Sequence, residues 1–232
     1  MRVILIVSVL WVQFSFGTEA AVRDSLPEYS SGKPNLKLII PGIAGFAVSS
    51  FILDEHINSF FRSNQTAFLN SASVYTDMGG EKKIVVPALL ATYASARFLI
   101  SDDKLKSASL NAIQSVIVTA IATEGTKIMA GRARPFTGRG AYHFDPVTGT
   151  DRFKSLPSGH ASLAFALFTP FAETYTRWIY AVPFSVAMGR VYLDKHWMSD
   201  VVMGGGFGLV SGILFTHHPN VQIIPSGLRI YF

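Results

Sequence analysis

The chain of 232 residues contains no cysteine and few charges. Without cysteine it can form no disulfide, no thiolate metal site and no catalytic thiol. Charged residues make up 15% of the sequence and apolar residues 49%, whereas the charged share of an average soluble domain is nearer a quarter. The chain is therefore rich in apolar residues, and it is long enough for one sizeable domain or at most two small ones.

The first twenty residues have the features of a secretory signal peptide. Arg2 supplies a positive start, an apolar run follows over residues 3–16, and the small residues Thr18 and Ala20 fit the last positions before a cleavage site. The run is short for a spanning helix, although an uncleaved anchor helix is the alternative. We expect residues 1–20 to be a signal peptide, residues 21–35 a polar arm, and the protein to be exported to the periplasm or cell envelope.

Six apolar segments follow, each long enough for a helix and none with sustained period-2 alternation. They predict an all-α fold, a single helical bundle of about six core helices within residues 36–218, with an extended tail over residues 219–232. The bundle is expected to associate with a membrane, as an integral or a peripheral protein. The segments cover residues 36–53, 84–100, 106–130, 160–176, 178–193 and 199–216.

Two long polar connections, at about residues 54–82 and 131–157, separate the apolar segments. Long connections inside a compact domain are uncommon and often functional. Most of the net charge of +5 lies around the second connection, because six cations and two acids fall between residues 125 and 160. A local basic patch indicates an anionic partner. No recognised nucleic-acid motif accompanies it, so nucleic acid is not the expected partner. The cations are Lys127, Arg132, Arg134, Arg139, Arg152 and Lys154.

Two of three short motifs place an anion site near this patch. In the segment KIMAGRARP, Lys127 and Arg134 lie seven residues apart, at a helix end and the start of a loop. In PSGH, residues 157–160, Ser158 can cap the next helix and Gly159 lies in its first turn. A helix N-terminus offers free N–H groups and a positive dipole end, so it favours an anion.

The third motif, GRVYLDKHWMSD, contains a histidine with an acid four residues later. His196 and Asp200 are close enough for the carboxylate to accept from Nδ1–H if both lie in one helical turn. A carboxylate that orients a histidine is the arrangement of an activated nucleophile. Arginine forks match phosphoryl oxygens. The residues therefore predict phosphoryl transfer, with His196 as nucleophile, Asp200 as its partner and His160 as leaving-group acid.

The same residues would surround the transferred group. Phosphoryl transfer without a metal ion needs positive charge and N–H donors around the equatorial oxygens. The expected phosphate-binding residues are Lys127, Arg134, Ser158, Gly159 and Arg190.

The order K-x6-R-P, P-S-G-H and R-x5-H-x3-D resembles the type 2 phosphatidic acid phosphatase superfamily, over about residues 84–216. That superfamily shares its fold with bacterial class A acid phosphatases, glucose-6-phosphatase and the vanadium haloperoxidases. The resemblance implies a helical bundle, a phosphohistidine intermediate and no metal or other cofactor. One departure is visible: the family has a serine before the arginine of the third motif, and this chain has Gly189. One hydrogen bond to phosphate is thereby in doubt, and the mechanism is not.

The sequence leaves several functions open. The first is a metal-independent phosphatase of lipid phosphates or diphosphates in the cell envelope. The alternatives are a soluble periplasmic acid phosphatase of broad specificity, a vanadate-dependent haloperoxidase, and a non-catalytic anion- or lipid-binding protein. His160 and His196, both present with Asp200, weigh against the last of these. No feature of the sequence sets an oligomeric state.

Overall fold

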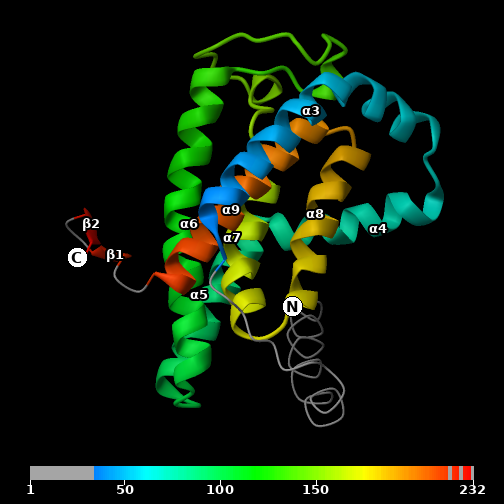
Figure 1. Cartoon of the computed structure of the whole chain (residues 1–232). Coiled ribbons are helices and arrows are strands. Elements are labelled where there is room, and N and C mark those ends of the chain that lie inside the picture. Colours follow the sequence, from blue (N-terminus) through cyan, green and yellow to red (C-terminus); the bar gives the residue numbers. More distant parts are fainter. Residues whose placement is uncertain (1–33, 219–220, 225–226, 231–232) are drawn as a thin grey trace. The chain divides into compact units, whose positions relative to one another are not determined.

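The computed structural model describes residues 34–218, 221–224 and 227–230, so the predicted signal peptide and nearly all of the polar arm lie outside the described residues. The described residues are mostly helical, which confirms the all-α prediction (Figure 1). A short antiparallel pair, β1 (Val221–Ile224) and β2 (Gly227–Ile230), follows the helices. The helices are α3 (Leu36–Ser63), α4 (Ala67–Asp77), α5 (Lys82–Phe98), α6 (Asp103–Ala130), α7 (Gly159–Thr174), α8 (Ala181–Tyr192) and α9 (Met198–His217).

Helix α7 is the centre of the bundle and packs against α6, α8 and α9 (Figure 1). Glycines every fourth residue on α9 allow the closest of these approaches. A Cβ on Gly204 would lie 2.4 Å from the carbonyl oxygen of Ser158, and one on Gly208 would lie 2.4 Å from that of Ser162. Any larger residue would push the two backbones apart, and this contact fixes the N-terminal end of α7 beside that of α9.

The apolar core lies between α5, α6, α7 and α8. Its buried members are small or branched residues of mixed size, as close packing requires. They are Val85, Leu89, Ala112, Ala164, Leu167, Phe168 and Val186.

Three helices, α3, α6 and α9, are long and apolar enough to cross a membrane, judged by length and composition. Helix α3 leaves most of its apolar surface uncovered by the rest of the described chain. Leu38 is 72% exposed, Phe46 62% and Ile52 68%. Contiguous apolar surface on this scale marks an interaction with lipid or another protein.

The expected polar connection at residues 54–82 is wrong. Helix α3 continues to Ser63, and α4 occupies most of the remainder. The polar residues that suggested a loop form one face of α3, where Asp54 and Asn58 are buried one turn apart. Thr66 then begins α4, since its Oγ1 accepts from the N–H of Leu69 at 3.2 Å.

The second connection, predicted at about residues 131–157, is present between α6 and α7 and folds back on itself. Gly131 ends α6 with φ +59°, and a Cβ there would lie 2.0 Å from the carbonyl oxygen of Asp145. The N–H of Ser155 donates to the carbonyl oxygen of Arg132 at 3.0 Å, and that of Arg134 donates to Arg152 at 2.9 Å. These bonds hold the connection over the ends of the helices (Figure 1).

Candidate active site

The predicted residues meet at one end of the bundle, where helices of opposite direction alternate. The C-terminal parts of α6 and α8 carry Lys127 and Arg190, and the N-terminal parts of α7 and α9 carry His160 and Asp200. The two helix N-termini direct positive dipole ends toward this region. Positive side chains and positive helix ends therefore converge, as an anion site requires.

Ser158 and Gly159 form the floor of this site. The N–H of Ser158 donates to the backbone carbonyl of Asp200 at 2.9 Å, which ties the start of α7 to α9. Lys127 lies directly alongside, because a Cβ on Gly159 would lie only 3.6 Å from its Cε. Its Nζ donates to the carbonyl oxygen of Lys154 at 2.8 Å. The ammonium group is thus buried and held beside the N-terminus of α7.

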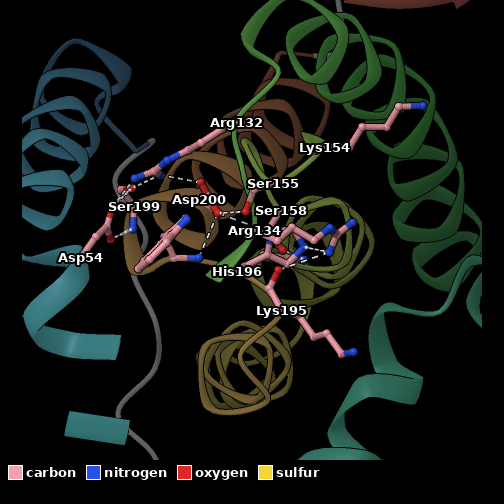
Figure 2. A network of polar contacts seen from close by, with 12 residues as sticks. Asp54, Arg132, Arg134, Lys154, Ser155, Ser158, Lys195, His196, Ser199 and Asp200 are labelled. Atoms are coloured by element: carbon pink, nitrogen blue, oxygen red, sulfur yellow. Dashed lines mark hydrogen bonds and ion pairs between the residues drawn. The ribbon is translucent and has the colours of Figure 1, made fainter. Parts of the chain in front are cut away.

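His196 is buried with its two nitrogens facing groups of opposite charge. Nε2 lies 3.3 Å from Nη1 of Arg134, and Nδ1 lies 3.5 Å from Oδ2 of Asp200. Figure 2 shows this arrangement, with Asp200 between Arg132 and His196. The distance of 3.5 Å is long for a hydrogen bond, so Asp200 orients the ring mainly through its charge in this state.

Burial makes the imidazole of His196 neutral. Loss of hydration lowers its pKa to about 3, and the cations Arg134 and Lys127 act in the same direction, while Asp200 opposes them. A neutral imidazole has a free lone pair on one nitrogen. With Asp200 next to Nδ1, the proton belongs on Nδ1 and the lone pair on Nε2, which faces Arg134.

Asp200 is itself fixed by a buried network. Arg132 Nη1 donates to Oδ1 at 2.7 Å, the N–H of Trp197 donates to Oδ2 at 2.9 Å, and Ser155 Oγ donates to the same Oδ2. These three donors leave the carboxylate little freedom to turn away from His196. The network is drawn in Figure 2.

Arg132 connects this carboxylate to a second one on α3. Its Nη2 donates to Oδ2 of Asp54 at 2.7 Å, and its Nε to the carbonyl oxygen of Ala141 at 2.8 Å. Ser199 joins the pair, since its N–H donates to Oδ1 of Asp54 at 2.9 Å. The side chains of Arg132, Asp54 and Asp200 are completely buried. In the sequence, Arg132 belongs to the basic patch with no role of its own, and no pattern singles out Asp54.

Arg134, in contrast, reaches the surface of the site. Its Nη2 pairs with Oδ1 of Asp151 at 3.0 Å, and its Nη1 also donates to the carbonyl oxygen of Lys195 at 3.2 Å. The carboxylate of Asp151 is 79% exposed, so it is a partner that solvent or an anion can replace. Arg134 is therefore available to bind phosphate, and Arg132 is not.

His160 and Arg190 face two carboxylates that the sequence analysis missed. Nε2 of His160 lies 3.7 Å from Oδ1 of Asp77 and 3.8 Å from Oε2 of Glu81. Arg190 Nη1 forms an ion pair with the same Oδ1 of Asp77. Burial, followed by Arg190, lowers the pKa of His160 below its usual value, and Asp77 and Glu81 oppose that shift. Both acids lie in the region expected to be a loop, where nothing linked them to the motifs.

The packing of α4 against α8 explains why position 189 is a glycine. A Cβ on Gly189 would lie 2.5 Å from Oγ1 of Thr76. Thr76 Oγ1 donates to the carbonyl oxygen of Ser73 at 3.0 Å, so the space that a serine side chain would take is already occupied by α4. The departure from the family pattern is thus explained by the close approach of the neighbouring helix.

A search of the described residues for three His, Asp or Glu side chains placed to share a metal ion finds none. The site is instead lined by cations, which suits an anion such as a phosphate group.

A family model described as the PAP2 superfamily matches residues 108–223, which is half of the chain. The chain belongs to the PAP2 superfamily. The matched range includes all three predicted motifs. The resemblance seen in the sequence is thereby confirmed, and the described helices form the bundle expected of a PAP2 protein.

Curated PAP2 relatives act on lipids according to their names. Lipid A 1-phosphatase of Rhizobium johnstonii is 34% identical over 111 residues, and that of Rhizobium etli 33%. Each match covers 44% of this chain and 46% or 48% of the relative, so the alignment spans about half the length of these two proteins. Undecaprenyl-diphosphatase of Sulfolobus acidocaldarius is 26% identical over 71% of this chain and 75% of its own.

Two solved structures have the same fold. Aquifex aeolicus LpxE aligns with a TM-score of 0.57 and 17% identity, over 71% of this chain and 95% of its own. The transmembrane PAP2-type phosphatidylglycerolphosphate phosphatase of Bacillus subtilis aligns with a TM-score of 0.54 and 20% identity, over 76% and 93%. At these identities the likeness establishes the fold.

Proposed function

We propose that this protein is a phosphatase that hydrolyses a lipid phosphate ester through a phosphohistidine on His196. The observation that carries the proposal is the state of His196. Its imidazole is fully desolvated and neutral, Nδ1 faces the fixed carboxylate of Asp200, and Nε2 faces the guanidinium of Arg134. The nucleophile is thus next to both its orienting group and a cation that can bind phosphate.

The reaction follows from that geometry. The lone pair of Nε2 attacks phosphorus, the bond from phosphorus to the ester oxygen breaks, and protonated His160 gives its proton to the departing oxygen. His160 then takes a proton from water, whose oxygen attacks the phosphohistidine and releases phosphate. Lys127, Arg134, Arg190 and the amides of Ser158 and Gly159 hold the non-bridging oxygens while charge moves among them.

Arg134 must change partner when substrate binds. In the present state its Nη1 donates toward the nitrogen that attacks phosphorus. A phosphoryl oxygen placed between the two groups would take over this hydrogen bond and leave the Nε2 lone pair free. Because the side chain of Asp151 is exposed, its ion pair with Arg134 contributes little free energy, and the guanidinium can shift at small cost.

A lipid substrate is supported by two independent observations. Three helices are apolar and long enough to enter a membrane, and the relatives named above are a lipid A phosphatase and an undecaprenyl-diphosphatase. Export to the periplasm and the absence of a metal requirement stay predictions from the sequence.

The test is release of inorganic phosphate from phosphatidate by the purified full chain in detergent, with EDTA present. Wild type should be active, and His196→Ala should lose several orders of magnitude in kcat. A nucleophile acts as a unit with its partners, so removing it alone should cost about as much as removing all of them. His143→Ala is the matched control, because that histidine contacts Arg139 and Phe153 at the surface of the connection. When wild-type protein is mixed briefly with substrate labelled at phosphorus, the protein should retain labelled phosphate in an acid-labile bond. Activity that persists in His196→Ala would contradict the mechanism.

A further inference from the structure

Two carboxylates flank the nitrogen that would protonate the leaving group. Asp77 ends α4, and Glu81 follows the short helix η1 (Met78–Gly80). Both lie within 4 Å of Nε2 of His160. Their side chains are 32% and 39% exposed, so they stand where the site opens to solvent and not inside the buried network.

The backbone of η1 holds these acids against His160. A Cβ on Gly80 would lie 2.7 Å from Cβ of His160 and 2.9 Å from Val186. The two elements therefore touch directly, and no larger residue fits between them. Glu81 is also the N-cap of α5, since Oε1 accepts from the N–H of Lys83, which leaves Oε2 as the oxygen nearer to His160.

Charges are divided unevenly across the site. Arg134 contacts His196, and Lys127 lies beside Gly159 at the N-terminus of α7. Around His160, Arg190 is paired with Asp77, and Glu81 has no cation within ion-pair distance among the described residues. Once His160 has given up its proton, Arg190 faces two carboxylates there, and Arg134 acts on His160 more weakly.

A leaving-group oxygen that takes the proton of His160 must come within about 3 Å of Nε2. Its next atoms are then within a few ångströms of both carboxylates. In a monophosphate the departing group is a neutral alcohol, which the carboxylates of Asp77 and Glu81 do not repel. In a diphosphate the departing group is a second phosphate, and its negative charge is repelled by the same acids.

We infer that Asp77 and Glu81 are specificity-determining residues, which favour a lipid monophosphate with an alcohol leaving group and disfavour a lipid diphosphate. The inference rests on the proposed function and names its substrate class. The relatives include proteins of both kinds by name, a 1-phosphatase and a diphosphatase, so the choice has to come from residues of this chain. The acids near His160 supply it.

The size of the effect follows from Coulomb's law. One unit charge several ångströms from another, in a partly solvated site, changes the relative rates by roughly three- to tenfold. Removing one carboxylate should therefore change the ratio of diphosphate to monophosphate kcat/KM by that factor, without abolishing either reaction.

The experiment compares farnesyl monophosphate with farnesyl diphosphate, which share one lipid chain and differ in the leaving group. The full chain in detergent is assayed for kcat/KM as wild type, Glu81→Gln and Asp77→Asn. Glu81→Gln is isosteric and keeps the Oε1 acceptor that caps α5. Asp103→Asn is the charge-matched control, because that carboxylate is 86% exposed and pairs with Lys106 at the start of α6.

Wild type should prefer the monophosphate. Glu81→Gln should raise the ratio of diphosphate to monophosphate kcat/KM by about three- to tenfold, Asp77→Asn at least as much because it also releases Arg190, and Asp103→Asn less than twofold. An unchanged ratio in Glu81→Gln, or a wild type that prefers the diphosphate, would overturn the inference.

A binding measurement separates this inference from the proposed function. If neither lipid is hydrolysed, the proposed function fails, and affinities for orthophosphate and pyrophosphate measured by calorimetry still test the acids. Glu81→Gln should then increase the affinity for pyrophosphate more than the affinity for orthophosphate. Equal changes for both anions would contradict the inference whatever the activity.

Discussion

The two histidines of this site have opposite surroundings. His196 is 1% exposed and belongs to a network of Asp200, Arg132 and Asp54, whose ion pairs are 2.7 Å long and fully buried. The side chain of His160 is 25% exposed, and its carboxylate neighbours lie 3.7 and 3.8 Å away with side chains open to solvent. One half of the site is fixed before substrate arrives, and the other half is free to adjust.

This difference matches the two roles proposed for these histidines, nucleophile for His196 and proton donor for His160. A nucleophile needs one protonation state and one orientation, and burial with a fixed carboxylate provides both. A proton donor has to gain and lose its proton in each cycle, so it needs a pKa within the working range, which the two carboxylates beside Nε2 of His160 adjust. The site therefore divides its residues into a rigid side at His196 and a titrating side at His160.

The largest effect is expected from the rigid side. Arg132→Met leaves Asp54 and Asp200 buried without their cation, which typically costs about 3–5 kcal/mol. The variant should unfold at markedly lower temperature than wild type in detergent, measured by circular dichroism. Adding Asp54→Asn should recover part of the loss, because one uncompensated charge is removed.

Arg134→Met is the comparison that tests the division. Arg134 lies two residues further along the chain, but its carboxylate partner is exposed. This variant should melt within a few degrees of wild type while losing phosphatase activity. If both variants melted alike, the distinction between a structural and a phosphate-binding arginine would be wrong.

The positions of these two arginines show which contacts can be predicted from the sequence and which cannot. The motifs at residues 127–135, 157–160 and 190–200 located His196, Asp200, His160 and the cations proposed to bind phosphate, because each motif is local and its spacing fits a helix end. Arg132 pairs with Asp54 over a separation of 78 residues. No local pattern reports such a pair, and only the packing of α3 beside α9 creates it.

The missed acids of the titrating side have a related cause. Residues 54–82 are polar enough to suggest a connection, so Asp77 and Glu81 had no expected place. In the fold, α4 ends against α8, and η1 packs on the start of α7. A short helix that mixes polar residues with exposed apolar ones, such as Phe68 and Tyr75, looks like a loop when no single apolar face marks it.

A further prediction concerns pH. Burial lowers the pKa of His196 to about 3, so the nucleophile is neutral above that value. Burial and Arg190 lower the pKa of His160 below its usual value of 6.5, and the acid is lost as pH rises through it. The profile of kcat/KM should therefore fall on its alkaline side with a midpoint below 6.5. Asp77→Asn should move that midpoint lower, since a carboxylate that raises the pKa is removed.

His160→Asn is the variant that assigns the alkaline limb. It should lose about 10²- to 10⁴-fold in kcat/KM on an alkyl phosphate, and much less on p-nitrophenyl phosphate, whose leaving group departs without a proton. Ionisation of the substrate itself persists in this variant, so its profile supplies the baseline. An alkaline limb that is the same in wild type and His160→Asn would show that His160 is not the acid.

The smallest effect is expected where α4 meets α8, at the residue that departs from the family pattern. Gly189→Ser brings a Cβ to 2.5 Å from Oγ1 of Thr76, so the Thr76 hydroxyl must give up its bond to Ser73 or α4 must shift, and with it Asp77, the ion-pair partner of Arg190. Overpacking of this kind costs about 1–3 kcal/mol, and we expect a lower melting temperature together with a modest loss of kcat/KM. The double variant Thr76→Ala, Gly189→Ser removes the clash and should regain both. If Gly189→Ser alone were as stable and active as wild type, α4 would not be held tightly enough to position Asp77, and the acids beside His160 would owe their place to η1 and α5 instead.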